Sequence, residues 1–413
     1  MKHIIILISF AAMLTAADWP QFLGPDRNAV SSETKLIRSF PEGGPAIDWK
    51  TSTGDGFGGA AIAAGKLYFL DRAGDNDAVR CLDAASGKEL WRYAYPAPAK
   101  ISYPGSRATP TVNGVLVYVV GPKGHFTCLD KETGKVVWQK NIMDDYGSKL
   151  PTWGYSQNPL VYKKTVIVSV FADSAGLVAY DLASGDVVWK SRTLSGGACY
   201  VSPVLAEVDG IEQVLIISAK TKSGSGEIAG FDPNTGADLW SYDGWQCTIP
   251  ISFPLAVGDG KFFITAGYGA GSVMIQVKKS GSSFSVSKVF ATQDCGAQIH
   301  LPLFINGYLY AHSNDNSRRD GLVCLSLDGE KKWGTGKEPN FEKGGMLSAD
   351  GVIYSVDGDS GILYIIDPSP DGYKPLAQAK VLTTKTAWAP LAIANGKLYL
   401  RDQKTIYCVS IAQ

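Results

Sequence analysis

The sequence has no excess of charge of either sign and no long hydrophobic run suited to crossing a membrane. Its 39 basic and 39 acidic residues balance to a formal charge of zero, which argues against binding to nucleic acid or to an acidic membrane surface. After residue 17, no apolar run approaches the roughly 18 residues of a membrane-spanning helix. A transmembrane segment is therefore not expected.

Reactive side chains are also sparse. Only His125, His300 and His312 follow residue 17, so a hydrolytic triad is poorly supported. His125 lies in a predicted turn, GPKGHF, where we expect it to be solvated. The seven cysteines include no adjacent pair, no CxxC motif and no CxxCH motif for covalent haem. Because their number is odd, at least one thiol is unpaired within the chain.

The N-terminus has the pattern of a cleavable signal peptide over residues 1–17. Lys2 provides a positive charge, an apolar run follows over residues 4–14, and Thr15-Ala16-Ala17 fits a signal peptidase site. No cysteine stands at this cleavage site, so a bacterial lipid anchor is not expected. We therefore predict a periplasmic or secreted protein.

One phrase recurs along the chain and predicts its architecture. It consists of an alternating apolar segment that ends in Asp, a turn with the pattern D-x-x-[ST]-G, and a second segment with Trp 8 residues after the Asp. Asp caps backbone amides and Gly tolerates positive φ, so the unit is a β-hairpin. Four copies keep this spacing: Asp83 to Trp91, Asp130 to Trp138, Asp181 to Trp189 and Asp232 to Trp240.

A second marker, a short segment followed by a Gly turn and a strand, precedes each hairpin and occurs eight times between residues 58 and 401. With four strands per unit, the pattern predicts an all-β, eight-bladed β-propeller. The unit at 273–290 has lost its Trp. The strand at 46–54, with Trp49, completes the blade that the C-terminal strand leaves unfinished. Each repeated Trp is expected to pack on the neighbouring blade.

These boundaries divide the chain into three parts. Residues 1–17 are the predicted signal peptide, residues 18–45 an N-terminal lead, and residues 46–413 a single propeller domain. We expect the lead to pack on the propeller through Trp19 and Phe22. A monomer is the favoured oligomeric state.

The cysteines fall into two groups. Four occupy equivalent third-strand positions and are expected to be small buried hydrophobic residues: Cys81, Cys128, Cys324 and Cys408. The other three precede the inner strands of successive blades, where the blades come closest, so one disulfide among them is an open alternative: Cys199, Cys247 and Cys295.

The pattern D-x-x-[ST]-G-x-x-x-W resembles the tryptophan-docking motif of the PQQ-like (quinoprotein alcohol dehydrogenase-like) propeller repeat, from about residue 18 to the end. DWPQFLGPDRN at 18–28 is similar to the opening of a group of exported bacterial PQQ-like propeller proteins. The family includes quinoprotein alcohol dehydrogenases and the BamB scaffold of outer-membrane protein assembly. The resemblance implies the fold but leaves two classes of function open.

For a quinoprotein dehydrogenase, the resemblance implies a quinone at the centre of one propeller face. It also implies a vicinal Cys-Cys disulfide, a Glu/Asn/Asp calcium site, an Asp general base and long loops over the chamber. This chain has no adjacent cysteines, and its units average roughly 49 residues, close to bare four-stranded blades. No residue is assigned to the calcium ligands or the base. PQQ with calcium stays a possible cofactor, but catalysis is not the favoured interpretation.

The predicted binding site is the mouth of the central channel, where all inner strands converge. Residues just before the inner strands supply cationic, aromatic and amide groups that suit a small anionic or polyol ligand. The alternative is that they fill the channel by hydrogen bonding to one another and to water. The candidate residues are Arg107, Tyr155, Gln157, Tyr200, Gln298, His300, Lys343 and Trp388.

Three functions follow from these observations. The favoured one is an exported, non-catalytic propeller that acts as a binding or protein-interaction scaffold in the cell envelope. Its partner would be an unknown envelope protein or a small polar or anionic ligand. The first alternative is a PQQ-dependent dehydrogenase of alcohols or sugars, in which Arg107, Lys343 and Trp388 would contact the quinone. The second is a carbohydrate-binding propeller, suggested by the aromatic and amide groups of the presumed channel.

Overall fold

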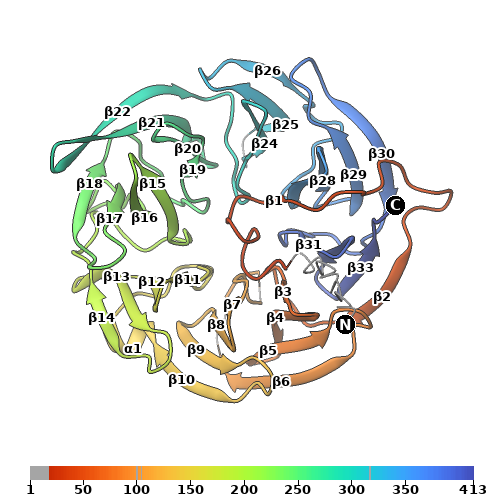
Figure 1. Ribbon diagram of the computed structural model, residues 1–413. Coiled ribbons are helices and arrows are strands. Elements are labelled where there is room, and N and C mark those ends of the chain that lie inside the picture. The colour runs from red at the N-terminus through yellow and green to blue at the C-terminus, as the bar shows by residue number, and fades with distance from the viewer. Residues whose placement is uncertain (1–17, 99–100, 104, 316–317) are drawn as a thin grey trace, which may run out of the picture.

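The alternating apolar segments form antiparallel sheets in the computed structural model, which describes residues 18–98, 101–103, 105–315 and 318–413. The predicted signal peptide at 1–17 lies outside the described residues. Eight sheets stand in a ring around a central axis (Figure 1), and each runs from an inner strand near the axis to an outer strand at the rim. The predicted eight-bladed propeller is confirmed.

Each blade is an antiparallel sheet built around four strands. The first three blades contain β3 (Ala61–Ala63), β4 (Lys66–Ala73), β5 (Asn76–Asp83) and β6 (Glu89–Pro96), then β7 (Thr111–Asn113), β8 (Leu116–Val120), β9 (His125–Asp130) and β10 (Val136–Asn141), then β11 (Leu160–Tyr162), β12 (Thr165–Ala172), β13 (Ala175–Asp181) and β14 (Val187–Lys190). The next three contain β15 (Val204–Val208), β16 (Ile211–Ile217), β17 (Ile228–Phe231) and β18 (Asp238–Tyr242), then β19 (Leu255–Ala256), β20 (Lys261–Ala266), β21 (Gly271–Ser280) and β22 (Ser283–Thr292), then β23 (Leu303–Ile305), β24 (Tyr308–Asn314), β25 (Arg319–Ser326) and β26 (Lys331–Gly334). The seventh contains β1 (Val30–Ser31), β27 (Met346–Ala349), β28 (Val352–Val356), β29 (Ile362–Asp367) and β30 (Lys374–Lys380), and the eighth β31 (Ala392–Ala394), β32 (Lys397–Arg401), β33 (Thr405–Ser410) and β2 (Ile47–Ser52).

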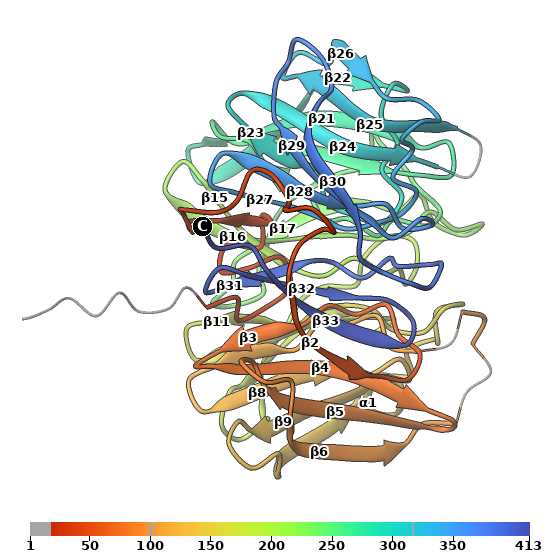
Figure 2. The ribbon, with the colours of Figure 1, turned by 90° about the vertical axis from the view of Figure 1, so that its right-hand side faces the viewer.

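The ring closes through the two ends of the chain, as predicted. The early strand β2 pairs antiparallel with β33 and becomes the outer strand of the eighth blade (Figure 2). A buried ion cluster ties this blade to the first one. The Asp71 carboxylate lies 3.6 Å from the Arg401 guanidinium and 2.8 Å from that of Arg80. Pairing of these groups offsets part of the cost of burying their charges.

Each Asp of the repeat shapes its own turn and each Gly receives a Trp. The Asp130 carboxylate accepts hydrogen bonds from the backbone N–H and the hydroxyl of Thr133, at 2.8 and 2.7 Å. A Cβ on Gly134, whose φ is +68°, would lie 2.4 Å from the Trp91 ring of the preceding blade. The Trp91 indole N–H also donates to the Lys131 carbonyl of this turn, at 3.0 Å. Trp91 therefore docks on the neighbouring blade, as predicted.

The fourth and fifth blades depart from this docking pattern. In the fifth blade, Phe290 replaces the missing Trp and lies against Gly329 of the next turn, where a Cβ would be 2.6 Å from the Phe ring. One long hairpin, β21–β22, stands where the fifth blade would have its D-x-x-[ST]-G turn. The Trp240 indole of the fourth blade therefore bonds within its own blade, to the Gln213 side chain at 2.5 Å.

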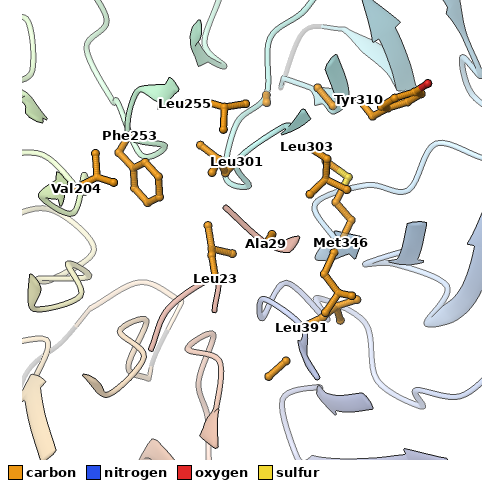
Figure 3. Packing of buried hydrophobic residues seen from close by; sticks show 14 of the residues in the cluster. Leu23, Ala29, Val204, Phe253, Leu255, Leu301, Leu303, Tyr310, Met346 and Leu391 are labelled. Atoms are coloured by element: carbon orange, nitrogen blue, oxygen red, sulfur yellow. The ribbon is translucent and has the colours of Figure 1, made fainter. Parts of the chain in front are cut away.

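The N-terminal lead packs on the propeller and enters its axis. Trp19 is 2% exposed, and its backbone exchanges hydrogen bonds with the first inner strand at 2.9 and 2.8 Å. Phe22 packs edge-to-face on Phe253, with ring centroids 6.2 Å apart. Leu23 and Ala29 lie in the centre of the ring, among apolar side chains around the axis (Figure 3). The lead thus contributes to the core, through both residues expected to dock it.

Arg27 fixes the lead inside the ring. Its guanidinium is buried and donates to the carbonyls of Asn158, Pro159 and Pro203, just before two inner strands. Burial lowers the pKa of Arg27 to about 9. Further along the lead, β1 pairs in parallel with β27 of the seventh blade. Arg27 and β1 therefore hold the lead to opposite parts of the ring.

The lead covers the face that carries the turns between first and second strands. The Asp18 carboxylate accepts a hydrogen bond from the N–H of Ala64, and the Glu33 carboxylate accepts from Asn395 and Gly396. All three donors belong to such turns. The segments that precede the inner strands lie at the other end of the channel, so the lead fills the axis from the side opposite to them.

The structure also answers two expectations about reactive side chains. All seven cysteines are buried free thiols, so no disulfide joins Cys199, Cys247 or Cys295 in this structure. The expectation that His125 is solvated in a turn was wrong. His125 begins β9, because the turn ends at Gly124, and its ring packs on Tyr95 at 4.8 Å between centroids.

The described part of the chain is almost entirely β-structure. Its helix, α1 (Ile142–Tyr146), has 5 residues. No helix among the described residues is long and apolar enough to cross a membrane.

Candidate ligand-binding site at the channel mouth

A cavity of about 260 Å³ opens at the mouth of the channel, beside the segments that precede the inner strands. This volume is close to the lower limit for small-molecule sites, about 300 Å³. Phe22 of the lead lines the cavity beside Phe253. The lining residues are Phe22, Phe57, Tyr103, Arg107, Trp153, Ser156, Asn158, Tyr200, Ser202, Ile251, Ser252, Phe253, Tyr268, Gln298, Ile299, His300, Leu301, Lys343, Trp388 and Pro390.

Most residues predicted for this site line the cavity: Arg107, Tyr200, Gln298, His300, Lys343 and Trp388. The prediction was wrong for Tyr155 and Gln157. The Gln157 amide donates to the Ser169 carbonyl at 2.5 Å and accepts from its N–H at 2.6 Å. Tyr155 is buried, and its hydroxyl donates to a backbone carbonyl at 3.3 Å. Side chains alternate along this extended stretch, and Ser156 and Asn158 take the cavity side.

Aromatic rings form two walls of the cavity. Phe57, Tyr103 and Trp388 contact one another, with ring centroids 5.5 to 6.5 Å apart. Trp153 and Tyr200 form the second wall, with centroids 5.4 Å apart and an interplanar angle of 38°. Sequence reasoning missed Phe57, Tyr103 and Trp153, because they lie in loops outside the repeat. Only the aromatic content of those loops could have indicated them.

Most polar groups of the cavity are already engaged within the protein. The Asn158 side chain accepts from the Thr109 N–H at 2.6 Å and donates to the Ser202 hydroxyl at 2.9 Å. His300 donates through Nε2 to the Lys343 carbonyl at 3.0 Å, since a carbonyl can only accept. Burial lowers the pKa of His300 to about 4, so the ring is neutral at pH 7. Asn158 and His300 therefore join the segments that precede the inner strands of different blades.

Two cations reach the cavity, and they differ in their partners. The Lys343 ammonium lies 2.5 Å from the Glu342 carboxylate and 5.1 Å from the centre of the Trp388 ring. The Arg107 guanidinium lies 5.1 Å from the centre of the Phe57 ring, and within the described residues it donates its hydrogen bonds to backbone carbonyls. Burial lowers the pKa of Arg107 to about 10. Within the described part of the chain, Lys343 is charge-compensated and Arg107 is not.

The residues of the cavity do not fit a quinone held by calcium and served by a carboxylate base. Calcium prefers carboxylate and other oxygen ligands, and oxidation of an alcohol needs a base for the hydroxyl proton. Among the described lining residues, none is Asp or Glu. The described residues also contain no group of three His, Cys, Asp or Glu side chains that could hold a metal ion. The two aromatic walls and the two cations of the cavity suit a flat anionic ligand that is bound without calcium.

Comparison with known proteins places the chain among relatives of two kinds. BamB, the outer membrane protein assembly factor of Shewanella oneidensis, is 25% identical over 279 residues, which cover 63% of this chain and 64% of that protein. The quinohemoprotein alcohol dehydrogenase ADH IIB of Pseudomonas putida is 34% identical over 142 residues, covering 31% of this chain but 20% of the enzyme. The match therefore spans about a fifth of that dehydrogenase.

Solved structures of both kinds share the fold. BamB from Moraxella catarrhalis superposes with a TM-score of 0.59 at 18% identity, covering 89% of this chain and 97% of that one. A europium-containing methanol dehydrogenase superposes with a TM-score of 0.66 at 14% identity, covering 93% and 89%. The profile of the family described as outer membrane protein assembly factor BamB matches residues 35–198 and 170–372. Because these segments exceed half of the sequence, the chain belongs to this family of PQQ-like β-propellers.

Proposed function

We propose that this chain is an exported, non-catalytic propeller that works in the cell envelope as a binding protein or protein-interaction scaffold. In this proposal, residues 18–45 close the channel and residues 46–413 form the propeller domain that binds. The cavity at the channel mouth is the binding site. Relatives named as outer membrane assembly factors support the envelope setting, and the signal-peptide pattern at 1–17 supports export.

One observation carries the proposal. The channel ends in a cavity with two aromatic walls and a half-buried arginine that has no counterion among the described residues, and its described lining residues include no Asp or Glu. Aromatic rings and a few placed polar groups are typical of sites that bind small ligands. A carboxylate is the usual proton acceptor for oxidising an alcohol and the usual ligand for calcium. The lining therefore favours binding over dehydrogenation.

The dehydrogenase alternative rests on a specific observation, the similarity to quinohemoprotein and quinoprotein alcohol dehydrogenases. The carbohydrate-binding alternative has less support from the site. A sugar presents many hydroxyl groups, which need free polar partners. In this cavity, Asn158, Ser202 and His300 already use hydrogen-bonding groups for contacts within the protein.

A ligand screen with a blocked variant tests the proposal. We would measure the melting temperature of residues 18–413 with a library of aromatic acids, sugars, amino acids and short peptides. Ligands at about 100-fold over their dissociation constant should stabilise the protein by about 2.7 kcal/mol. The variant Ser156→Trp fills the cavity and should lose these shifts, whereas Ser282→Trp, at an exposed hairpin tip, should keep them. If no compound stabilises the wild-type protein, or if the blocked variant responds equally, this proposal is wrong.

A further inference from the structure

The charged side chains of the cavity indicate which class of ligand it binds. This inference rests on the proposed function. Lys343 already has a carboxylate partner at 2.5 Å. Arg107 is the cation left without one among the described residues, and its hydrogen bonds go to three backbone carbonyls of its own loop. The Arg107 side chain is half-buried, so its guanidinium loses part of its hydration without gaining a counterion, and a ligand that brings one negative charge compensates that loss. The site is therefore matched to a single negative charge.

The surroundings of Arg107 define the body of the ligand. Its guanidinium lies over Phe57, 5.1 Å from the ring centre, and Tyr200 lines the same cavity. Phe57 belongs to one aromatic wall and Tyr200 to the other. The charge therefore lies against one wall of a cavity whose other wall is also aromatic. Flat rings stack on such walls, whereas a saturated acid gains less from them.

Gln298 supplies a second polar group, a hydrogen-bond acceptor, to the cavity. It is 6% exposed and lines the cavity. Its Nε2 donates to the Tyr268 hydroxyl at 2.7 Å, while its Oε1 has no hydrogen-bond partner among the described residues. A buried carbonyl oxygen left without a donor is unfavourable. A ligand hydroxyl or N–H group would satisfy it.

The backbone at the rim is held in an unusual conformation. Tyr103, Tyr268, Glu342 and Thr386 have φ values of 59°, 60°, 43° and 62°, in the left-handed region that non-Gly residues rarely adopt. Tyr103 and Tyr268 line the cavity, and Glu342 pairs with Lys343. Such strain persists where the surrounding structure imposes it, often at ligand sites.

We propose that the cavity binds a small aromatic monocarboxylate, with one ring or two fused rings between the walls. Its carboxylate pairs with Arg107, and a hydroxyl or N–H group on the ring donates to Gln298. No metal takes part. This ligand differs from a quinone cofactor with several carboxylates, since the cavity offers one uncompensated cation. The volume of about 260 Å³ suits a compact ligand of this kind.

Calorimetric titration of residues 18–413 tests the proposal with defined probes. 4-Hydroxybenzoate should bind, and the neutral 4-hydroxybenzyl alcohol should bind about 30-fold more weakly, because one charge-assisted hydrogen-bonded pair is lost. Benzoate should bind about fivefold more weakly than 4-hydroxybenzoate, because it leaves Gln298 unsatisfied. Cyclohexanecarboxylate, which has charge but no aromatic ring, should bind more weakly than benzoate.

Variants assign these effects to residues. Arg107→Gln should abolish the preference for the acid over the alcohol, Arg107→Lys should restore part of it, and the exposed Arg319→Gln should leave it unchanged. Gln298→Leu should make benzoate and 4-hydroxybenzoate bind equally. The probe comparison on the wild-type protein gives the same test if Arg107→Gln fails to fold.

The outcomes separate this inference from the proposed function. If the alcohol binds wild-type protein as tightly as the acid, or Arg107→Gln keeps the preference, the charge pairing is wrong. If none of the aromatic acids binds while another library compound gives a shift that Ser156→Trp abolishes, the ligand class is wrong and the binding function stands. If no compound of either set binds, both proposals fail.

Discussion

The contact of Trp49 with Gly87, where the ring closes, should contribute measurably to the free energy of unfolding. Gly87 has φ +71°, and a Cβ there would lie 2.5 Å from the ring of Trp49, on the strand that completes the eighth blade. Gly65 has φ +74°, and a Cβ there would meet nothing within 4 Å. Gly87→Ala and Gly65→Ala therefore share the same backbone strain and differ in the contact with Trp49.

The expected magnitudes follow from these contacts. A left-handed Ala costs about 1 kcal/mol, which is the whole effect expected for Gly65→Ala. Gly87→Ala adds overpacking of about 1–3 kcal/mol against the indole. It also weakens the bond from the Trp49 indole N–H to the Ala84 carbonyl at 3.0 Å, worth about 1 kcal/mol. The total for Gly87→Ala is about 3–5 kcal/mol.

Urea unfolding followed by circular dichroism measures both free energies of unfolding. A loss for Gly87→Ala that exceeds the loss for Gly65→Ala by about 2 kcal/mol or more supports docking as the contact that holds the ring closed. Equal losses, within about 0.5 kcal/mol, would show that only backbone strain matters and that the Trp contact adds nothing.

Three further predictions concern the axis and the buried histidine. Arg27→Met should lower the free energy of unfolding by about 2–3 kcal/mol, because buried carbonyls lose a charged donor. The control Arg38→Met, at an exposed residue of the same lead, should change it by less than about 0.5 kcal/mol. Equal urea midpoints for the two variants would contradict this. Phe22→Ala should enlarge the cavity, because Phe22 is one of its lining residues. Two-ring acids should then gain affinity over one-ring acids in calorimetric titration, and an unchanged ratio of the two affinities would contradict this. Burial holds the pKa of His300 at about 4, below its value near 6.5 in the unfolded state. Between these two values the unfolded state binds more protons, so the free energy of unfolding falls as the pH drops. The expected loss is about 2 kcal/mol between pH 7.5 and pH 5. His300→Gln should remove that part of the pH dependence, and identical pH profiles of the two proteins would refute it.

The repeat made the ring predictable from sequence. The spacing from Asp130 to Trp138 encodes a capped turn and a docking ring, and each of its residues has one local physical role. Even the degenerate fifth blade was located, because the hairpin alternation survives the loss of Trp. Its replacement by Phe290 was not predicted, since only the position of Gly329 beneath the ring identifies it.

The site was less predictable because its residues lie outside the repeat. The path of Leu23 and Ala29 through the axis depends on left-handed backbone at φ 60° and 58°, for which these residue types give no signal. Tyr103 and Trp153 belong to loops without periodicity. Tyr155 and Gln157 were placed in the cavity by position alone, whereas in the segment before β11 their side chains bond to the protein backbone and Ser156 and Asn158 line the cavity instead.

The distinction between binding and quinone-dependent oxidation is the most direct point to measure. Residues 18–413 would be incubated with PQQ, with and without Ca²⁺, and the melting temperature and the reduction of a dye by primary alcohols and sugars would be recorded. Since the described cavity lining holds no Asp or Glu, we predict no calcium-dependent rise in melting temperature and no dye reduction above the protein-free rate. A calcium-dependent rise together with substrate-dependent dye reduction would contradict the proposed non-catalytic function.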